Sequence, residues 1–384
     1  MTKINNFFKL FIFFIISIIL FLVIDFLISK NTNFFFVKKD CFKYNKIVFE
    51  KKNYYNYDLY KDCFAIEHKG VSGAYNVYTN EIGTRVGPKE NKTNKNVEKI
   101  IFLGDSFTYG FGVDYEYSIP GQIDSLTENK YEIINFGLMG YSPSMNYFLL
   151  KKYLDENPDL KIKKIFYILD ITDVHDESNR WINIDKLNTP VILYQPTIDE
   201  IQKNLDEDNK FRAARLVAYL INKNLRNIKK KLENYFDTNI DEKKSYKTFW
   251  SMFIYTPKEM LKENKDFLSV WKNDKETGIK NIEMKIINIS NLIKEYDNSI
   301  DFYITYHPWI DTLLYGQEEF SWENFGEKLC IISKCTKSIN FFNDVRKLQN
   351  INSDWKKLLY FKNDLHFTKE GNQLYSFRIF SDAF

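Results

Sequence analysis

Five short apolar runs recur along the chain from residue 100 onward, and each predicts a buried strand. A helix candidate between the first two runs, residues 117–126, places Ile119, Ile123 and Leu126 on one face. Further helix candidates cover about 144–154 and the segment from Gly371 to the C-terminus. Because strands and helices alternate at the spacing of βαβ units, the pattern predicts a parallel sheet with right-handed crossovers. The five runs are 100–103, 131–136, 164–169, 299–305 and 337–342.

Two long stretches depart from this alternation. Residues 31–97 are polar and aromatic without a sustained helical period, which favours an N-terminal extension or spacer. Residues from about 176 to 297 are rich in Lys and Asn, with Leu and Ile at helical intervals. This stretch is interpreted as a helical insertion, or as a pair of long crossover helices, within a main domain that covers residues 98–384.

The most apolar stretch lies at the start of the chain. Residues 10–24 are almost entirely Phe, Ile, Leu and Val, and Lys3 and Lys9 precede them. Such a stretch approaches the ~20 residues that span a bilayer. No small-residue cleavage pattern follows, so residues 1–30 are predicted to be an uncleaved, single-pass membrane anchor. The leading lysines predict that this end stays cytoplasmic and that the rest is exported, to a periplasmic or extracellular location.

The cysteines form an even set, which suits disulfides in an exported protein. Cys330 and Cys335 are close enough in sequence to bridge locally, which would leave Cys41 with Cys63. The other two pairings stay open at this point. No Cys-x-x-Cys and no cluster of histidines indicates a metal site.

Composition narrows the classes of partner. The 54 Lys and Arg residues and 51 Asp and Glu residues leave a formal charge of +3, and the charges are interspersed. No basic patch therefore indicates nucleic-acid binding. No Gly-x-Gly-x-x-Gly follows a predicted strand, which argues against a dinucleotide site.

The candidate chemistry begins where the first predicted strand ends, at Gly104-Asp105-Ser106. Ligands bind at the carboxyl ends of strands in open α/β sheets, because loops and helix starts expose backbone N–H groups there. A serine at this point is an accessible candidate nucleophile. The alternative is that Asp105 or Ser106 only caps a helix, a common role for both residue types.

A serine hydroxyl needs a base, and the chain has four histidines. His366, just before the closing helix, is the candidate base, and Asp364 is placed to orient it. A cap or turn role is the alternative for Asp364. His307 also follows a predicted strand and is a rival base, although its Pro-Trp neighbours favour a structural role.

These blocks together resemble the SGNH (GDSL-type) hydrolases. Gly104-Asp105-Ser106 resembles the nucleophile block, and the Asp364 to His366 segment resembles the last block. One residue separates Asp364 from His366 where the commonest members have two, a spacing similar to that of the alginate acetyltransferase-type branch. The resemblance implies a three-layer α/β/α sandwich, with the five-stranded parallel sheet of flavodoxin-like folds, and a catalytic triad of Ser106, His366 and Asp364.

The resemblance also implies an oxyanion hole. Its donors would be the Ser106 N–H, the N–H of Gly140 in the second block, and a side chain in the third block. There the family's Asn-Asp appears as Thr172-Asp173, so either Thr172 or a water substitutes, or the hole is weaker. Candidate substrate contacts are Asp173, His307 and Arg85, the last from an Asn-x-x-Gly-x-Arg element typical of membrane-associated members. The alternative for Arg85 is a surface position or a structural ion pair.

The function predicted first is hydrolysis of an ester through an acyl-serine intermediate. The expected substrate, inferred from the predicted anchor and the family resemblance, is an O-acylated glycan of the cell envelope. An O-acetyltransferase of envelope polysaccharide would use the same residues, with a sugar hydroxyl in place of water. A catalytically impaired glycan-binding envelope protein is the third reading, because Thr172 departs from the pattern. The serine mechanism implies no cofactor. The expected partners are the ester substrate, the membrane and polysaccharide-assembly proteins.

Overall fold

The computed structural model divides the chain into two compact units. One comprises Met1–Lys39 and Pro196–Asp241, and the other comprises Asp40–Gln195 and Glu242–Phe384. The structure describes residues 2–31, 40–68, 73–88, 97–183, 187, 189–193, 198–199, 201–202, 265–314, 320–361 and 364–384. For residues 2–10, 26–31, 265–274, 311 and 314 it describes the backbone alone.

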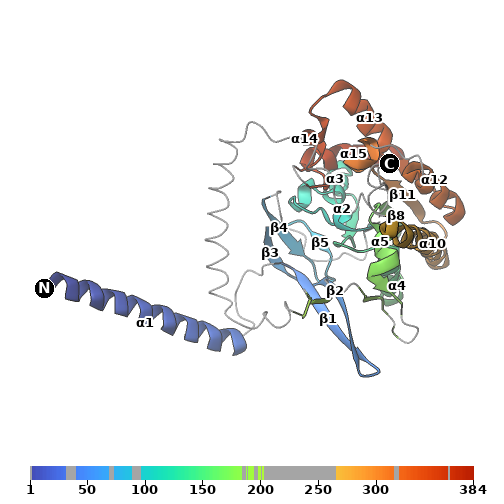
Figure 1. The fold of residues 1–384 in the computed structure, drawn as a ribbon. Helices are drawn as coiled ribbons and strands as arrows, with labels where there is room; N and C mark the ends of the chain where they lie inside the picture. The colour runs from blue at the N-terminus through green and yellow to red at the C-terminus, as the bar shows by residue number, and fades with distance from the viewer. Residues whose placement is uncertain are drawn as a thin grey trace. The chain divides into compact units, whose positions relative to one another are not determined.

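A five-stranded parallel sheet forms the centre of the larger unit (Figure 1), which confirms the predicted α/β fold. Its order is β12-β11-β8-β6-β7, and every neighbouring pair is parallel. All five residues of β6 are buried, as expected for a strand covered on both faces. The strands are β6 (Lys99–Leu103), β7 (Glu132–Asn135), β8 (Ile162–Leu169), β11 (Asp301–Tyr306) and β12 (Lys337–Asn340).

This strand order places the site. The chain runs from β6 to β7 on one side and then crosses to β8 on the other side of β6. The carboxyl ends of β6 and β8 therefore border the point where the strand order reverses, which is where open α/β sheets bind ligands. The nucleophile block follows β6, and the Thr172 block follows β8.

Helices cover the sheet in two groups (Figure 1). α3 (Ile119–Leu126) packs against α15 (Lys369–Ala383), whereas α10 (Lys265–Tyr296) packs against α4 (Pro143–Glu156) and α12 (Trp322–Ser333). The buried residues Ile282, Ile286, Ile289 and Ile293 follow the helical period and form the core face of α10. Further helical segments in the described part of the larger unit are α2 (Ser106–Tyr109), η1 (Tyr115–Tyr117), α5 (Asp173–His175), η2 (Asp176–Arg180), α11 (Ile310–Leu314), α13 (Phe342–Ile351) and α14 (Trp355–Leu359).

The segment interpreted as a spacer contains strands. β1 (Phe42–Phe49) and β2 (Lys52–Leu59) form an antiparallel hairpin, and β3 (Phe64–His68), β4 (Ala74–Thr79) and β5 (Arg85–Val86) form a second antiparallel sheet. The disulfide Cys41–Cys63 joins the two sheets covalently, and Cys330–Cys335 closes the end of α12. Tyr and Asn supply much of β1 and β2, which obscures the apolar alternation expected of strands.

The predicted insertion is described only in part. A short pair, β9 (Trp181–Ile182) and β10 (Val191–Ile192), lies near its start, and α10 supplies its end. Residues 203–264, which carry most of the predicted insertion, lie outside the described residues.

The N-terminal helix α1 spans Thr2–Asn31. Within the described part of the chain, no helix combines the length and apolar character that crossing a membrane requires. The anchor expected over residues 1–30 thus stays a prediction from the sequence.

Candidate active site

A sharp turn follows β6 and presents the nucleophile. Gly104 adopts φ +149°, a conformation that side chains rarely tolerate. A Cβ on Gly104 would lie 2.1 Å from Thr108 Oγ1 and 2.8 Å from the Ile168 carbonyl oxygen. Only glycine lets the chain turn this tightly between β6 and α2.

Asp105 begins the helix that carries Ser106. Its Oδ1 accepts a hydrogen bond from the Phe107 N–H at 2.9 Å, which is the arrangement of a helix N-cap. Burial, and next the charge of Asp170, raise the pKa of Asp105 well above its ordinary value. The capping role considered for Asp105 is therefore present, and it leaves Ser106 partly exposed at the first position of α2.

Three residues form a continuous hydrogen-bonded chain at this edge of the sheet. Ser106 Oγ lies 2.8 Å from His366 Nε2, and His366 Nδ1 lies 2.6 Å from Asp364 Oδ1. Burial opposes the charge of Asp364, but the hydrogen bond and charge of His366 outweigh it and lower the pKa of this carboxyl. Asp364 is thus anionic at neutral pH and holds Nδ1 protonated, which leaves Nε2 free to take the Ser106 proton.

Two further contacts fix the imidazole. The backbone N–H of His366 also donates to Asp364 Oδ1, at 2.9 Å, so one carboxylate oxygen receives both bonds. The ring packs beside Phe107 and Phe111, with centroid distances of 4.9 and 4.2 Å. A single intervening residue is therefore sufficient, because the tight turn brings the carboxylate to ring Nδ1.

Two backbone donors are available near the nucleophile. Within the described residues, neither the Ser106 N–H nor the Gly140 N–H donates a hydrogen bond to another protein group. Gly140 has φ +69°, which turns the chain sharply just before α4. These two amides are the ones that the oxyanion hole implied by the resemblance would use.

Thr172 does not supply the third donor in this arrangement. Its hydroxyl donates to Asp170 Oδ1 at 2.5 Å, and its backbone N–H donates to the same oxygen at 2.9 Å. The other oxygen of Asp170 accepts from Trp309 Nε1 at 2.7 Å. A threonine hydroxyl has one hydrogen, and here it is committed to the carboxylate two residues earlier. This corrects the expectation that Thr172 replaces the family's asparagine.

Arg85 is a structural residue and not the substrate contact considered above. Its side chain is fully buried. Nη1 donates to the carbonyls of Tyr109 and Gly110, both at 2.6 Å, and Nη2 donates to those of Asn76 and Val113 at 3.2 and 2.5 Å. The guanidinium thus ties β4 to the loop that follows the nucleophile helix.

Asp173 and His307, the other two expected substrate contacts, are both buried in the protein. Asp173 accepts from the Tyr167 hydroxyl at 3.1 Å, and burial, reinforced by neighbouring carboxylates such as Asp105, raises its pKa well above the ordinary range. His307 is buried against Phe107, at a centroid distance of 4.1 Å, and burial lowers its pKa to about 4. Among the described residues no hydrogen bond joins His307 to Ser106, whereas His366 Nε2 lies 2.8 Å from Ser106 Oγ, so His366 is the histidine placed to act as the base.

Two buried asparagines that the sequence analysis did not single out support the site. Asn146 accepts from the Gly104 N–H at 3.2 Å and donates to the Gly104 carbonyl at 3.4 Å. Asn135 donates to the Thr108 carbonyl and accepts from the Gly137 N–H, at 3.0 and 2.9 Å. The position of Asn135 at a strand end is a signal that sequence can give. Asn146, inside a helix, carries no such signal.

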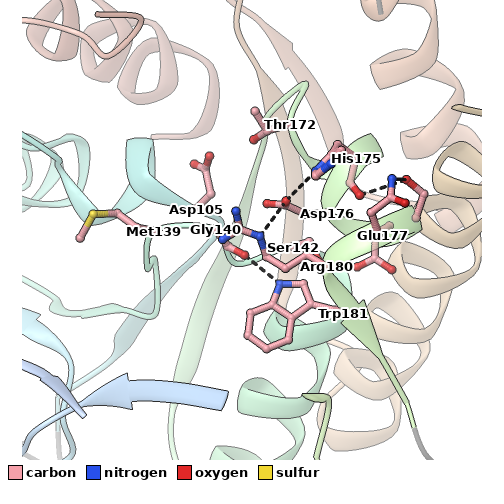
Figure 2. A network of polar contacts seen from close by, with 12 residues as sticks. Asp105, Met139, Gly140, Ser142, Thr172, His175, Asp176, Glu177, Arg180 and Trp181 are labelled. Carbon is pink, nitrogen blue, oxygen red and sulfur yellow. Dashed lines mark hydrogen bonds and ion pairs between the residues drawn. The ribbon is translucent and has the colours of Figure 1, made fainter. Parts of the chain in front are cut away.

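A π-helical turn, η2, borders the Gly140 loop (Figure 2). Glu177 accepts from the Ser142 hydroxyl at 2.5 Å, and from the N–H and hydroxyl of Ser144 at 2.7 and 2.8 Å, so it caps α4 from outside that helix. Asp176 lies between His175 and Arg180, with its Oδ1 3.0 Å from Arg180 Nε. Single π-helical turns occur frequently at functional sites.

The polar network does not form an evident metal centre. Among the described residues, no group of three or more His, Cys, Asp or Glu side chains is arranged to hold a metal ion. The buried carboxylates around β8 are instead held by tyrosine, tryptophan, serine and backbone donors.

Comparison with known proteins gives distant similarities. No family model matches the chain, and no curated protein matches it. Among solved structures, the chain is similar to a lipolytic protein of the G-D-S-L family from Veillonella parvula DSM 2008 (12% identity, 74% of this chain and 97% of that one, TM-score 0.39). It is also similar to the acetyl xylan esterase AlAXEase (12%, 74% and 100%, TM-score 0.38) and to AlinE4, an SGNH-hydrolase family esterase (14%, 76% and 97%, TM-score 0.34). With similarities this distant, the chemistry of this chain has to be argued from Ser106, His366 and Asp364 themselves.

Proposed function

We propose that the protein is a serine esterase that cleaves its substrate through an acyl-Ser106 intermediate. The observation that carries this proposal is the unbroken chain of hydrogen bonds from Ser106 Oγ through His366 to Asp364, at 2.8 and 2.6 Å. Nucleophile, base and orienting acid at these distances are the recurring apparatus of acyl transfer on unrelated folds.

In the first half-reaction Ser106 Oγ attacks the ester carbonyl carbon, and its proton passes to His366 Nε2. The carbonyl π pair moves onto oxygen, where the amides of Ser106 and Gly140 stabilise the negative charge. The intermediate then collapses. The alkoxide leaving group takes the proton from His366, and the acyl group stays on Ser106. Water, activated by the same imidazole, releases the acid and restores the serine.

A second candidate is O-acyl transfer, in which a sugar hydroxyl replaces that water. The observation that favours it is the single residue between Asp364 and His366, which resembles the alginate acetyltransferase-type branch. For either reaction we propose an O-acylated glycan of the cell envelope as substrate, with polysaccharide-assembly proteins as partners.

We also propose that the protein is exported and held at the membrane by its N-terminus. The support is the apolar stretch of residues 10–24 behind Lys3 and Lys9. The disulfides Cys41–Cys63 and Cys330–Cys335 agree with an oxidising compartment.

Labelling with a fluorophosphonate tests the nucleophile. The wild-type protein should form a covalent adduct, and Ser106→Ala should form none. A folded wild type that is never labelled would instead favour an impaired glycan-binding protein. A comparison of acetate release with acetyl transfer to an oligosaccharide distinguishes a hydrolase from a transferase. Transfer without appreciable release would favour the transferase and contradict the hydrolase.

A further inference from the structure

The guanidinium of Arg180 lies directly against Gly140, one of the two backbone donors of the proposed oxyanion hole (Figure 2). A Cβ on Gly140 would be 2.0 Å from Arg180 Nη1 and 2.9 Å from its Cζ. The absence of a side chain at position 140 therefore leaves the space that the guanidinium occupies. Residues 140 and 180 form a matched pair.

Arg180 is held from behind. Its Nε lies 3.0 Å from Asp176 Oδ1, and the Arg180 side chain is 16% exposed. Nη1 makes a long bond of 3.5 Å to the Tyr57 hydroxyl, which itself donates to the Met139 carbonyl at 2.6 Å. Burial disfavours the charged guanidinium, but Asp176 compensates and the pKa of Arg180 is raised. Arg180 is therefore a fixed cation.

The hole lacks a third donor that the side chain after β8 was expected to supply. The Thr172 hydroxyl is bound to Asp170, whose second oxygen is bound to Trp309. Within the described residues, Arg180 Nη2 has no protein partner, and Nη1 has only the long bond to Tyr57. A charged donor is thus available at the Gly140 side of the hole.

We propose that Arg180 donates from its guanidinium to the ester carbonyl oxygen and stabilises the oxyanion together with the amides of Ser106 and Gly140. This inference rests on the proposed acyl-Ser106 chemistry. No proton leaves Arg180 during the reaction. As the Ser106 Oγ–carbon bond forms and the π pair moves to oxygen, the hydrogen bond shortens and strengthens, because charge-assisted bonds favour the anion over the neutral carbonyl.

The test measures steady-state hydrolysis of p-nitrophenyl acetate by Arg180→Met and Arg180→Lys. Arg180→Met should lower kcat by about 10²-fold, the usual cost of one oxyanion donor, and change KM by less than about 2-fold. Arg180→Lys should recover part of the loss, since it keeps a cation but not the planar fork. Arg346→Met, at an exposed arginine paired with Glu323, is the matched control and should keep wild-type kinetics.

Arg180→Met leaves Asp176 without its cation and could unfold the turn. The double replacement Arg180→Gln and Asp176→Asn removes both charges together, and circular dichroism verifies its fold. The same loss of kcat in this folded variant supports the proposal, whereas unchanged kcat overturns it.

If Arg180 only binds the substrate and does not stabilise the oxyanion, the kinetics differ. Mono-p-nitrophenyl succinate carries a carboxylate that p-nitrophenyl acetate lacks. If Arg180→Met raises KM for the succinate ester and leaves the kinetics of the acetate ester unchanged, Arg180 binds an anionic group of the substrate, and the oxyanion role is wrong. In either case, the proposed function is supported if the wild type turns over the ester and Ser106→Ala does not. A wild type without turnover and without fluorophosphonate labelling overturns both.

Discussion

One oxygen of Asp364 receives two hydrogen bonds from His366, one from ring Nδ1 at 2.6 Å and one from the backbone N–H at 2.9 Å. The carboxylate therefore fixes both the tautomer of the ring and the turn that carries it. Removal of the Asp364 carboxylate should therefore disturb both the protonation state of the His366 ring and the turn that positions it.

Asp364→Asn should lower kcat for p-nitrophenyl acetate by roughly 10³- to 10⁴-fold, because an amide lets Nδ1 become the acceptor and leaves Nε2 protonated against Ser106. Asp354→Asn is the matched control, since Asp354 is an exposed carboxylate that pairs with Lys357 three residues later. Activity of Asp364→Asn within a few-fold of wild type would show that another group orients His366.

His307 makes the stability of the fold dependent on pH. Its pKa is about 4 in the native protein against 6.5 in the unfolded chain, so the unfolded state binds more protons between these values. The contribution of neutral His307 to the free energy of unfolding is complete above pH 6.5 and is lost as the pH falls toward 4. A difference of this size corresponds to roughly 3 kcal/mol.

His307→Phe should therefore flatten the change in the free energy of unfolding between pH 6.5 and 4, measured by urea denaturation. The ring of His307 packs against Phe107 and Phe367, so phenylalanine suits the site. The same variant should turn over p-nitrophenyl acetate at pH 8 at a rate close to that of the wild type. Loss of all activity in a folded His307→Phe would restore His307 as a candidate base.

Gly140→Ala separates backbone strain from contact with Arg180. A Cβ at position 140 would overlap Arg180 Nη1, whereas a Cβ at Gly73, which also has positive φ, meets nothing within 4 Å. Both substitutions carry backbone strain of order 1 kcal/mol. Only Gly140→Ala should lower kcat, and combining it with Arg180→Met should cost less than the sum of the two single losses, because both act on one contact. Additive losses would show that the two residues act separately.

The apolar runs predicted the central parallel sheet, whereas Ser106, His366 and Asp364 were expected from short blocks that resemble those of the SGNH hydrolases. In β6 and β8 burial on both faces leaves a continuous hydrophobic signal. β1 and β2 escaped prediction because half-exposed hairpin strands rich in Tyr, Asn and Lys lack that signal. The hydrogen bond from Thr172 to Asp170 could have been predicted from the sequence, because Asp170 lies only two residues earlier.

The pairing of Arg180 with Gly140 had no local signal. The two residues are far apart in sequence, and they meet only because η2 folds back over the loop before α4. Arg180 lies at the start of the stretch interpreted as an insertion. A charged residue in such a stretch is expected to lie on the solvated surface. The role proposed for Arg180 depends on this tertiary contact, which the spacing of residues along the chain does not reveal.

The two disulfides should contribute unequally to stability. Cys41–Cys63 closes a sequence separation of 22 residues and Cys330–Cys335 one of 5, so loop-closure entropy predicts contributions of roughly 3 and 2 kcal/mol. Cys41→Ser/Cys63→Ser should lower the free energy of unfolding more than Cys330→Ser/Cys335→Ser does, in urea titrations without reductant. The first pair also fastens the hairpin that carries Tyr57, whose hydroxyl contacts Arg180. Its removal should therefore lower kcat for p-nitrophenyl acetate, while removal of the second pair should not. Equal kcat in both double variants would mean that the hairpin holds Tyr57 in place without the covalent link.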